Sequence, residues 1–314
     1  MRVVFAGTSD FAVPSLEALI ASRHEVVAVI SQPDKPSGRG LGLRVPPVKE
    51  VAQAHSIPVL QPERIRSPEA IAQIRGLGDV GALVVAAYGQ IIPKDLLKWP
   101  TYGAINIHAS ILPKYRGAAP IQHALIAGET RTGVTTMLMD EGLDTGDILL
   151  QESIDILADE NARELTQRLA RLGADLLLRT LDGLEDGTIA PVPQNDELAS
   201  IARSLPNDVG AIDWSLPASD IVNRVRGCTP RPGAFTRLGA MLLKVWLARV
   251  EDQAEMFSEP GQILLVDQDG IVVAAGSGSV RLVEVQPESR KRMTASEFAR
   301  GHKISPGDRF EVRC

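Results

Sequence analysis

Apolar residues are spaced differently in the two parts of this chain. Within residues 1–193, nearly continuous apolar runs alternate with segments in which apolar positions recur every three to four residues. Continuous runs are typical of strands that are covered on both faces, and the helical spacing is clearest over residues 160–184. This alternation predicts an α/β fold built on a doubly wound, mostly parallel sheet. The predicted strands are residues 3–6, 25–31, 79–88 and 103–110.

The pattern changes after residue 193. Residues 194–207 show no strong period and predict a linker, and residues 217–227 predict one helix. Short apolar runs separated by Gly and Asp turns then predict five strands. Together with the helix, they predict a small OB-like β-barrel as a second domain, residues 208–314. The strand segments read AFTRL, AMLLKVWLARV, GQILLVD, GIVVAAG and SVRLVEVQ.

Composition excludes several classes of protein. Hydrophobic residues make up 44% and charged residues 23% of the 314 residues, which excludes low-complexity disorder. No apolar run approaches the length of about 18 residues that a transmembrane helix needs, and the first apolar run is too short for a signal peptide. Two cysteines cannot form a disulfide framework. We therefore expect a cytoplasmic protein with no membrane partner.

A basic segment stands out in an acidic chain. The net charge of −6 argues against a protein that coats nucleic acid without regard to sequence. Residues 32–49, here called the basic loop, contain no acid from position 35 onward, and their prolines disfavour a regular helix across them. Both a solvated surface loop and a finger that orders on RNA fit this composition. Its basic residues are Lys35, Arg39, Arg44 and Lys49.

Common cofactor motifs are missing from the sequence. The first predicted strand ends in AGTSDF, which lacks the G-x-G-x-x-G pattern that admits a pyrophosphate, so the sequence argues against dinucleotide binding. The chain also lacks a GxxxxGK[ST] phosphate loop, a G-x-S-x-G motif and His/Cys spacing suited to a metal. We therefore expect chemistry that needs neither a dinucleotide nor a metal.

Three polar residues lie at positions suited to catalysis. Asn106 and His108 are two positions apart at the end of a predicted strand, so both side chains project to one side, at the edge where open α/β sheets bind ligands. Asp144 lies in a turn rich in glycine and acids. An amide can stabilise an oxyanion, an imidazole can move a proton, and a carboxylate can orient the imidazole and favour its charged form. Acyl-group chemistry is one interpretation, and purely structural roles are the other.

The segments around these residues resemble a known family. The sequence NIHASILPKYRGAAP, followed by MDEGLDTGDI, is similar to the folate-dependent formyltransferases. The resemblance extends to VVFAGTSDFAVPSLEAL, VISQPDKPSGRG, VVAAYGQIIP and IDWSLPASDIVNRVRGCTPRPGAFT, which together cover nearly the whole chain. It implies a Rossmann-like catalytic domain over residues 1–193 and a tRNA-contacting barrel over residues 208–314.

The resemblance also implies a reaction. A formyl group would pass from 10-formyltetrahydrofolate to the α-amino group of methionine esterified to initiator tRNA, a step of translation initiation. Asn106 and protonated His108 would stabilise the tetrahedral oxyanion formed when the neutral amine attacks. Asp144 would keep the imidazole protonated, and the amine's proton would pass to the departing folate without help from a metal.

Binding residues follow from the same resemblance. It implies folate contacts from Ser110, Ile111, Leu112 and Pro113, with Ile111 where the family more often has Leu. It implies a pterin pocket lined by Tyr88, Gly89 and Ile91. It implies tRNA contacts from Lys35, Arg39, Arg44 and Lys49, of which Arg39 is the strongest candidate.

The chain departs from the family at two places. Arg231 stands where the family often has Trp, and Ser204 stands where it often has Lys. Arg203 lies next to Ser204 and is the candidate to replace that lysine, so it remains open whether Arg203 or Arg231 takes over a tRNA contact.

Other functions remain to be separated from this one. A formyltransferase that acts on a small amine, such as glycinamide ribonucleotide or an amino sugar, would need the same three polar residues. The basic loop and the second domain favour tRNA, because a small substrate requires neither. A tRNA-binding protein without catalysis would not need the three residues, and a folate-hydrolysing deformylase would be expected to have an added N-terminal domain. We expect a monomer that binds charged initiator tRNA and no DNA.

Overall fold

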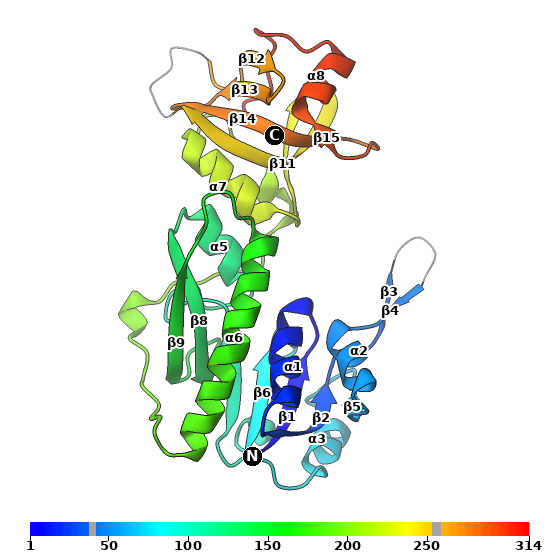
Figure 1. Cartoon of the computed structure of the whole chain (residues 1–314), viewed down its shortest axis with the longest axis vertical. Helices are drawn as coiled ribbons and strands as arrows, with labels where there is room; N and C mark the ends of the chain where they lie inside the picture. Colours follow the sequence, from blue (N-terminus) through cyan, green and yellow to red (C-terminus); the bar gives the residue numbers. More distant parts are fainter. Residues whose placement is uncertain (38–41, 253–258, 314) are drawn as a thin grey trace. The chain divides into compact units, whose positions relative to one another are not determined.

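The computed structural model describes residues 1–37, 42–252 and 259–313 and divides into two compact units (Figure 1). The first unit comprises Met1–Gly117, Thr132–Ile154 and Thr166–Ala202. The second comprises Ala118–Arg131, Asp155–Leu165 and Arg203–Cys314. The division is therefore not a single cut, because two short segments from the first 193 residues cluster with the C-terminal part of the chain.

The first unit is built on a seven-stranded sheet with the order β5-β2-β1-β6-β7-β8-β9. The ladders that join β5, β2, β1, β6 and β7 are parallel, and β8 runs antiparallel to β7. The prediction of a mostly parallel sheet is confirmed. The strands are β1 (Arg2–Gly7), β2 (Glu25–Ile30), β5 (Val59–Leu60), β6 (Ala82–Ala86), β7 (Ala104–His108), β8 (Arg131–Leu138) and β9 (Ile148–Asp155).

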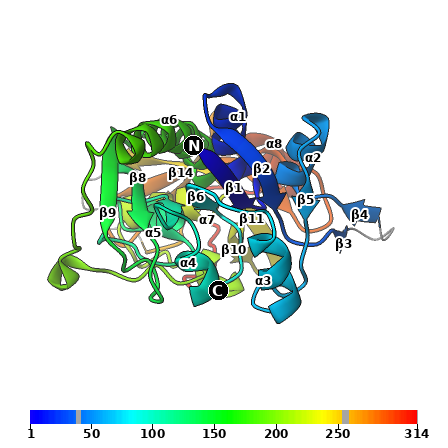
Figure 2. The same ribbon diagram turned by 90° about the horizontal axis from the view of Figure 1, so that it is seen from below.

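Helices cover both faces of this sheet, as its apolar strands require. Every residue of β6 is buried, and so are five of the six residues of β1. Helices α1 and α6 lie on one face, and α3 and α4 lie on the other (Figure 2). In α6, Gly173 permits close packing, because a Cβ atom there would lie 2.9 Å from the Ile107 side chain of β7. The helices are α1 (Val13–Ala21), α2 (Pro47–Ala54), α3 (Pro68–Arg75), α4 (Lys94–Leu97) and α6 (Ala162–Glu185), with 3-10 turns η1 (Asp10–Ala12) and η2 (Asp196–Leu198).

The basic loop contains more regular structure than its composition predicts. Strands β3 (Lys35–Ser37) and β4 (Gly42–Arg44) form an antiparallel hairpin in which Lys35 lies opposite Arg44. Helix α2 begins at Pro47, inside the range predicted to be irregular. The prolines explain this, because a proline in the first helical turn needs no N–H partner and so starts a helix instead of preventing one.

The second unit contains a six-stranded antiparallel sheet with the order β10-β11-β14-β13-β12, to which β15 adds by pairing with β14. The five predicted strands and the predicted helix are present, and the antiparallel C-terminal domain is confirmed. Trp214 and Phe310 stack in its core with ring centroids 5.7 Å apart. Its elements are α5 (Pro120–Ile126), η3 (Asn207–Gly210), α7 (Ala218–Cys228), β10 (Ala234–Leu238), β11 (Met241–Asp252), β12 (Ile263–Asp267), β13 (Gly270–Ala274), β14 (Ser279–Pro287), β15 (Met293–Thr294) and α8 (Ala295–His302).

A membrane-crossing helix is not found in the described part of the chain, because no helix there combines the necessary length with the necessary hydropathy.

Candidate active site

The structure brings Asn106, His108 and Asp144 together at the carboxyl edge of the parallel sheet. Asn106 and His108 lie in the last three residues of β7, and Asp144 lies in the turn between β8 and β9. The Asn106 amide donates to Asp144 Oδ1 over 3.3 Å, and His108 Nδ1 lies 3.5 Å from Asp144 Oδ2. Both contacts use the Asp144 carboxylate, so this carboxylate is the centre of the cluster.

Asp144 is held in an unusual backbone conformation. Its φ angle is +54°, in the left-handed region that residues other than glycine rarely adopt. The backbone N–H of Gly117 donates to Asp144 Oδ2 over 2.8 Å, and the side chain is 15% exposed. A strained backbone at a polar cluster is a frequent feature of active sites, where the surrounding contacts must enforce it.

The imidazole of His108 is nearly enclosed, with a side-chain exposure of 6%. Its Nε2 atom lies 2.9 Å from the backbone carbonyl oxygen of Tyr115. Both ring nitrogens therefore face oxygen acceptors, and an imidazole that carries both protons can donate to both. In this conformation Nε2 donates to the protein itself, so His108 can reach a substrate only if the Tyr115 carbonyl gives up this hydrogen bond.

The segment proposed to contact folate is anchored by its own hydrogen bonds. The buried hydroxyl of Ser110 donates to the Lys114 carbonyl over 2.6 Å. The backbone N–H of Leu112 donates to Thr135, and the Leu112 side chain is buried. Ile111 is partly buried, and the carbonyl of Pro113 faces the backbone N–H of Ser200. The side chains of Ser110 and Leu112 thus stabilise the loop.

The pterin candidates Tyr88, Gly89 and Ile91 follow β6 at the same edge of the sheet. The Tyr88 side chain is only 2% exposed, and burial raises the pKa of its phenol to about 12. Tyr88 therefore presents mainly its backbone at this edge. Its backbone carbonyl accepts hydrogen bonds from the Thr8 hydroxyl and the Gln32 side-chain amide. Ile91, by contrast, is 82% exposed, an unusual state for a large apolar side chain.

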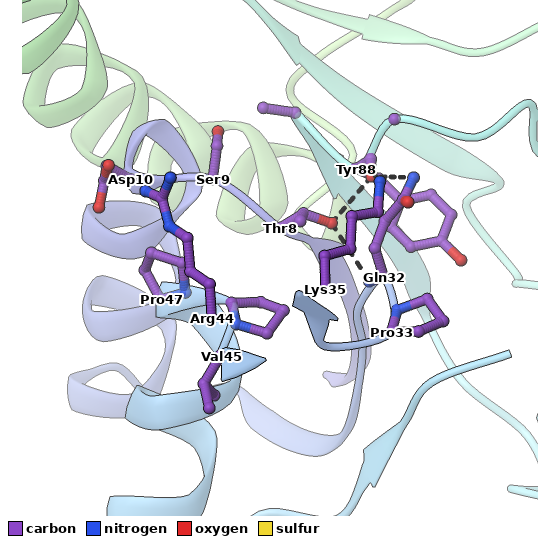
Figure 3. Close-up of a pocket in the computed structure, with 13 residues that line it drawn as sticks. Thr8, Ser9, Asp10, Gln32, Pro33, Lys35, Arg44, Val45, Pro47 and Tyr88 are labelled. Atoms are coloured by element: carbon purple, nitrogen blue, oxygen red, sulfur yellow. Dashed lines mark hydrogen bonds between the residues drawn. The ribbon is translucent and has the colours of Figure 1, made fainter. Parts of the chain in front are cut away.

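A cavity of about 470 Å³ opens where β1, β2 and β6 end (Figure 3). Polar groups from the ends of the strands form one wall. The β3–β4 hairpin of the basic loop and the proline-rich turn after it form another. Figure 3 shows Arg44 extending toward Ser9 and Asp10, and Lys35 extending toward Tyr88. The lining residues are Thr8, Ser9, Asp10, Gln32, Pro33, Lys35, Arg44, Val45, Pro46, Pro47, Ala87, Tyr88 and Gly89.

The four basic residues of the basic loop have different surroundings. Lys35 and Arg44 line the cavity, and neither has an ion-pair partner among the described residues. Lys49 instead lies in α2 and forms an ion pair with Asp34, at 2.8 Å. The hydrogen bond from Lys49 holds the pKa of Asp34 below its usual range. Arg39 lies outside the described residues.

Arg231 and Ser204, the two departures from the family, lie in the second unit, as does Arg203, the candidate to replace the lysine. Arg231 is exposed in the turn after α7. Arg203 is exposed as well, and its backbone carbonyl lies 2.9 Å from His123 Nε2. Both guanidinium groups are therefore available to an external anion.

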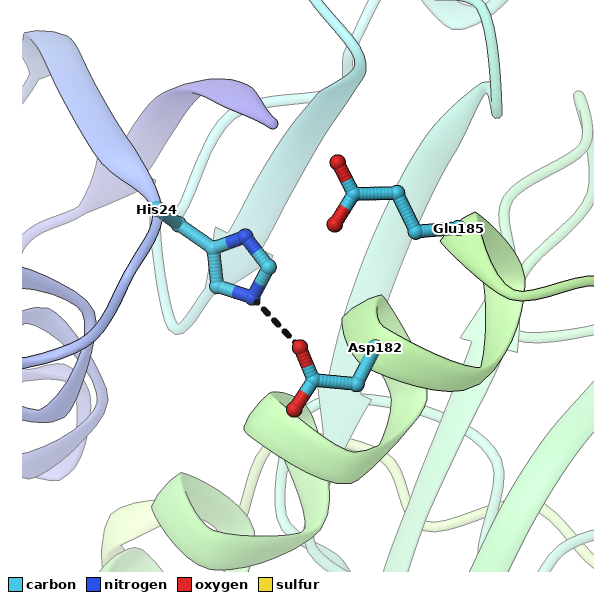
Figure 4. Close-up of side chains that lie close together, drawn as sticks. All are labelled: His24, Asp182 and Glu185. Carbon is cyan, nitrogen blue, oxygen red and sulfur yellow. Dashed lines mark ion pairs between the residues drawn. The ribbon is translucent and has the colours of Figure 1, made fainter.

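One cluster in the described residues has the composition of a metal site: His24, Asp182 and Glu185 (Figure 4). It lies at the start of β2 and the end of α6, at the opposite end of the sheet strands from Asn106 and His108. Its carboxylates already pair with cations of the chain, because Arg23 contacts both and the amino group of Met1 lies 2.9 Å from Glu185. Burial lowers the pKa of His24. We describe this cluster as an ion-pair network.

Comparison with known proteins follows the same division of the chain. A family model described as "Formyl transferase" matches residues 1–181, and another described as "Formyl transferase, C-terminal domain" matches residues 205–303. The chain belongs to the formyl transferase family. The family expected from the sequence is therefore confirmed.

Curated relatives match almost the entire chain. A protein of Geobacter metallireducens named methionyl-tRNA formyltransferase is 50% identical over 99% of this chain and 98% of its own length. One of Citrifermentans bemidjiense with the same name is 52% identical over 98% of this chain and 95% of its own length.

Solved structures share the fold at low identity. The sugar 3N-formyltransferase WlaRD, solved with 5-N-formyl-tetrahydrofolate, has a TM-score of 0.68 at 17% identity and covers 93% of this chain and 99% of its own. The methionyl-tRNA formyltransferase from Clostridium thermocellum has a TM-score of 0.55 at 16% identity, covering 80% of this chain and 94% of its own.

Proposed function

We propose that the chain transfers a formyl group from 10-formyltetrahydrofolate to the α-amino group of methionyl initiator tRNA in the cytoplasm, as a monomer. The supporting observation is that Asn106, His108 and Asp144 meet at the sheet edge in a chain about 50% identical, over nearly its full length, to proteins named methionyl-tRNA formyltransferase. The product would be N-formylmethionyl-tRNA for translation initiation.

The residues present fit a folate. Ile91 offers an exposed apolar side chain that a pterin ring would cover, and burying it would be favourable. Gly89 adopts a φ of +88°, and a Cβ atom there would lie 2.9 Å from the Gln32 amide, so this turn requires a glycine. We propose that Ile91, Gly89 and the segment from Ser110 to Pro113 hold the folate. When bound, 10-formyltetrahydrofolate would supply the formyl group.

The three polar side chains would then divide the work. The Asn106 amide would donate to the oxygen that gains negative charge during attack by the amine, which is often the largest single contribution to catalysis. Asp144 would hold the Asn106 amide and the His108 imidazole in place through its two carboxylate oxygens. His108 would move a proton after releasing Tyr115. No metal is required by this scheme.

The acceptor would approach from the cavity side. Lys35 and Arg44 face the cavity without ion-pair partners among the described residues, which leaves their charges for a polyanion. Beside them, Val45, Pro46 and Pro47 supply an apolar wall. Free positive charge beside an apolar wall suits an RNA end whose phosphates carry negative charge and whose aminoacyl group is apolar. A small amine would contact only a few of these residues. We propose that Arg39 and the domain over residues 208–314 add further tRNA contacts.

The test is a formylation assay with competing acceptors. Charged initiator tRNA, free methionine, glycinamide ribonucleotide and a nucleotide-linked amino sugar are each incubated with the protein and 10-formyltetrahydrofolate. Formyl transfer to tRNA is read from its mobility on an acid gel. We expect kcat/KM for the tRNA to exceed that of each small amine by at least about 100-fold, because the remote contacts contribute binding energy. A small amine that equals or exceeds the tRNA would overturn the assignment.

A further inference from the structure

The segment predicted to be a linker lies against the active-site loops within the first unit. Residues 194–202, here called the strap, follow β9 and α6 and contain the 3-10 turn η2. The strap reaches both sides of the contact between His108 and Asp144 through separate groups of hydrogen bonds.

At its first residue, the strap holds the backbone of Asp144. The Gln194 side-chain amide donates to the carbonyl oxygen of Asp144 over 2.9 Å and to that of Gly146 over 2.7 Å. The first carbonyl belongs to Asp144 itself, the residue with a positive φ angle, and the second lies two residues further along the same turn. A single NH₂ group thus donates to two carbonyls of the turn that contains the strained Asp144.

The Gln194 amide is itself oriented by an arginine. Arg116 donates to Gln194 Oε1 from Nε over 3.0 Å and from Nη2 over 2.8 Å. Arg116 is 5% exposed, and its Nη2 also lies 2.7 Å from Asp196 in the strap. Because an arginine can only donate, it fixes the amide oxygen toward itself and the NH₂ group toward the Asp144 turn.

The far end of the strap holds the loop that faces His108. Ser200 Oγ accepts from the Tyr115 N–H over 2.9 Å, and the Ser200 carbonyl accepts from the Arg116 N–H over 2.8 Å. The Ala202 N–H donates to the Arg116 carbonyl over 2.7 Å. This backbone pairing positions the Tyr115 carbonyl, which accepts from His108, and the Gly117 N–H, which donates to Asp144.

We propose that Gln194 is a positioning residue for formyl transfer: its amide, oriented by Arg116, keeps Asp144 in the conformation that aligns Asn106 and His108. This proposal rests on the proposed function of these three residues. A shift of about 1 Å in a catalytic group can cost about 100-fold in rate, so a lost turn contact would act on the rate rather than on substrate binding.

The decisive variant is Gln194→Glu. A glutamate keeps an oxygen acceptor for Arg116 but has no NH₂ group, so it turns a carboxylate oxygen toward the carbonyls of Asp144 and Gly146. If Gln194 only anchors Arg116, the variant retains full activity. If Gln194 positions Asp144, kcat falls. Gln53→Glu, on the exposed side of α2, is the matched control for the added charge.

We expect Gln194→Glu to lower kcat by roughly 10- to 100-fold, with both KM values within about twofold and a melting temperature close to that of the control. A kcat equal to that of Gln53→Glu would overturn the proposal while leaving the proposed function intact. Failure of the unmodified protein to formylate charged tRNA would instead overturn the proposed function.

Hydrogen exchange provides a readout that does not depend on activity. The Gly117 N–H donates to Asp144 Oδ2, so its protection reports the position of that carboxylate. We expect Gln194→Glu to speed exchange at Gly117 by at least about tenfold relative to Gln53→Glu. Unchanged exchange at Gly117 would overturn the proposal, whichever acceptor the enzyme uses.

Discussion

The carboxyl edge of the parallel sheet has two sides that are built in different ways. On the β7 and β8 side, the carboxylate of Asp144 is enclosed by Asn106, His108 and Gly117. On the side where β1, β2 and β6 end, a cavity of about 470 Å³ is lined by Lys35 and Arg44, which have no ion-pair partner among the described residues. The first side is fixed by internal hydrogen bonds, and the second has charges left for a ligand.

This difference suggests a division of labour between the two sides. Groups that must hold a reacting centre within a fraction of an ångström need many mutual contacts. Groups that hold a long, charged substrate need accessible charge instead, since phosphate contacts fix its position. Substitutions on the first side should therefore act on kcat, and substitutions on the second should act on the affinity for tRNA.

The largest effect is expected on the β7 and β8 side. We predict that Asn106→Ala, His108→Ala and Asp144→Asn each lower kcat by roughly 100- to 10,000-fold, because oxyanion and proton-transfer groups contribute on that scale. Steady-state formylation assays with charged initiator tRNA measure this, with circular dichroism as the folding control. A correctly folded His108→Ala variant with nearly normal kcat would remove His108 from the mechanism.

An intermediate effect is expected on the cavity side. We predict that Lys35→Ala combined with Arg44→Ala raises KM for charged tRNA about tenfold or more and leaves KM for the folate unchanged. Each lost phosphate contact should also reduce the slope of log affinity against log salt concentration by about one. Affinity measured at several salt concentrations tests this. An unchanged slope would mean that these residues contact no phosphate.

The smallest effect is expected at Lys49, whose charge is already used within the chain. We predict that Lys49→Met leaves tRNA affinity within about twofold and lowers the melting temperature by roughly 1–3 °C near pH 7. The pKa of Asp34 is lowered by this partner from its usual 3.8, so the pair stabilises the fold above that pH. The stabilisation disappears as pH falls below the lowered value. Melting curves near pH 7 and near pH 3 test whether the variant's loss of stability becomes smaller at low pH. A tRNA affinity lowered well beyond twofold would show that Lys49 contacts tRNA.

The sequence predicts the central strands because their burial leaves a simple pattern. The apolar runs of β1, β2, β6 and β7 end within a few residues of their predicted limits. The proximity of Asn106 and His108 follows from strand alternation. That Asp144 lies beside Asn106 could be expected only from the family resemblance, because no local pattern in the sequence indicates a contact across 38 positions.

The strap was not predictable from periodicity. Its residues act through single hydrogen bonds to distant loops, and such bonds impose no repeat on the sequence. Gln194 therefore looks like any polar residue in a linker. The ion pair of Lys49 was also not predictable from the acid-free stretch, because that stretch begins at residue 35 and the partner of Lys49 is Asp34, one position earlier.

Equilibrium binding of methionyl initiator tRNA, measured without the formyl donor, tests the division of labour most directly. The comparison uses Asp144→Asn and the Lys35→Ala, Arg44→Ala double variant at one salt concentration. We predict that Asp144→Asn binds with a Kd within about twofold of the unmodified protein and that the double variant binds about tenfold more weakly or worse. Equal weakening in both variants, or weakening only in Asp144→Asn, would contradict the assignment of catalysis to one side and tRNA binding to the other.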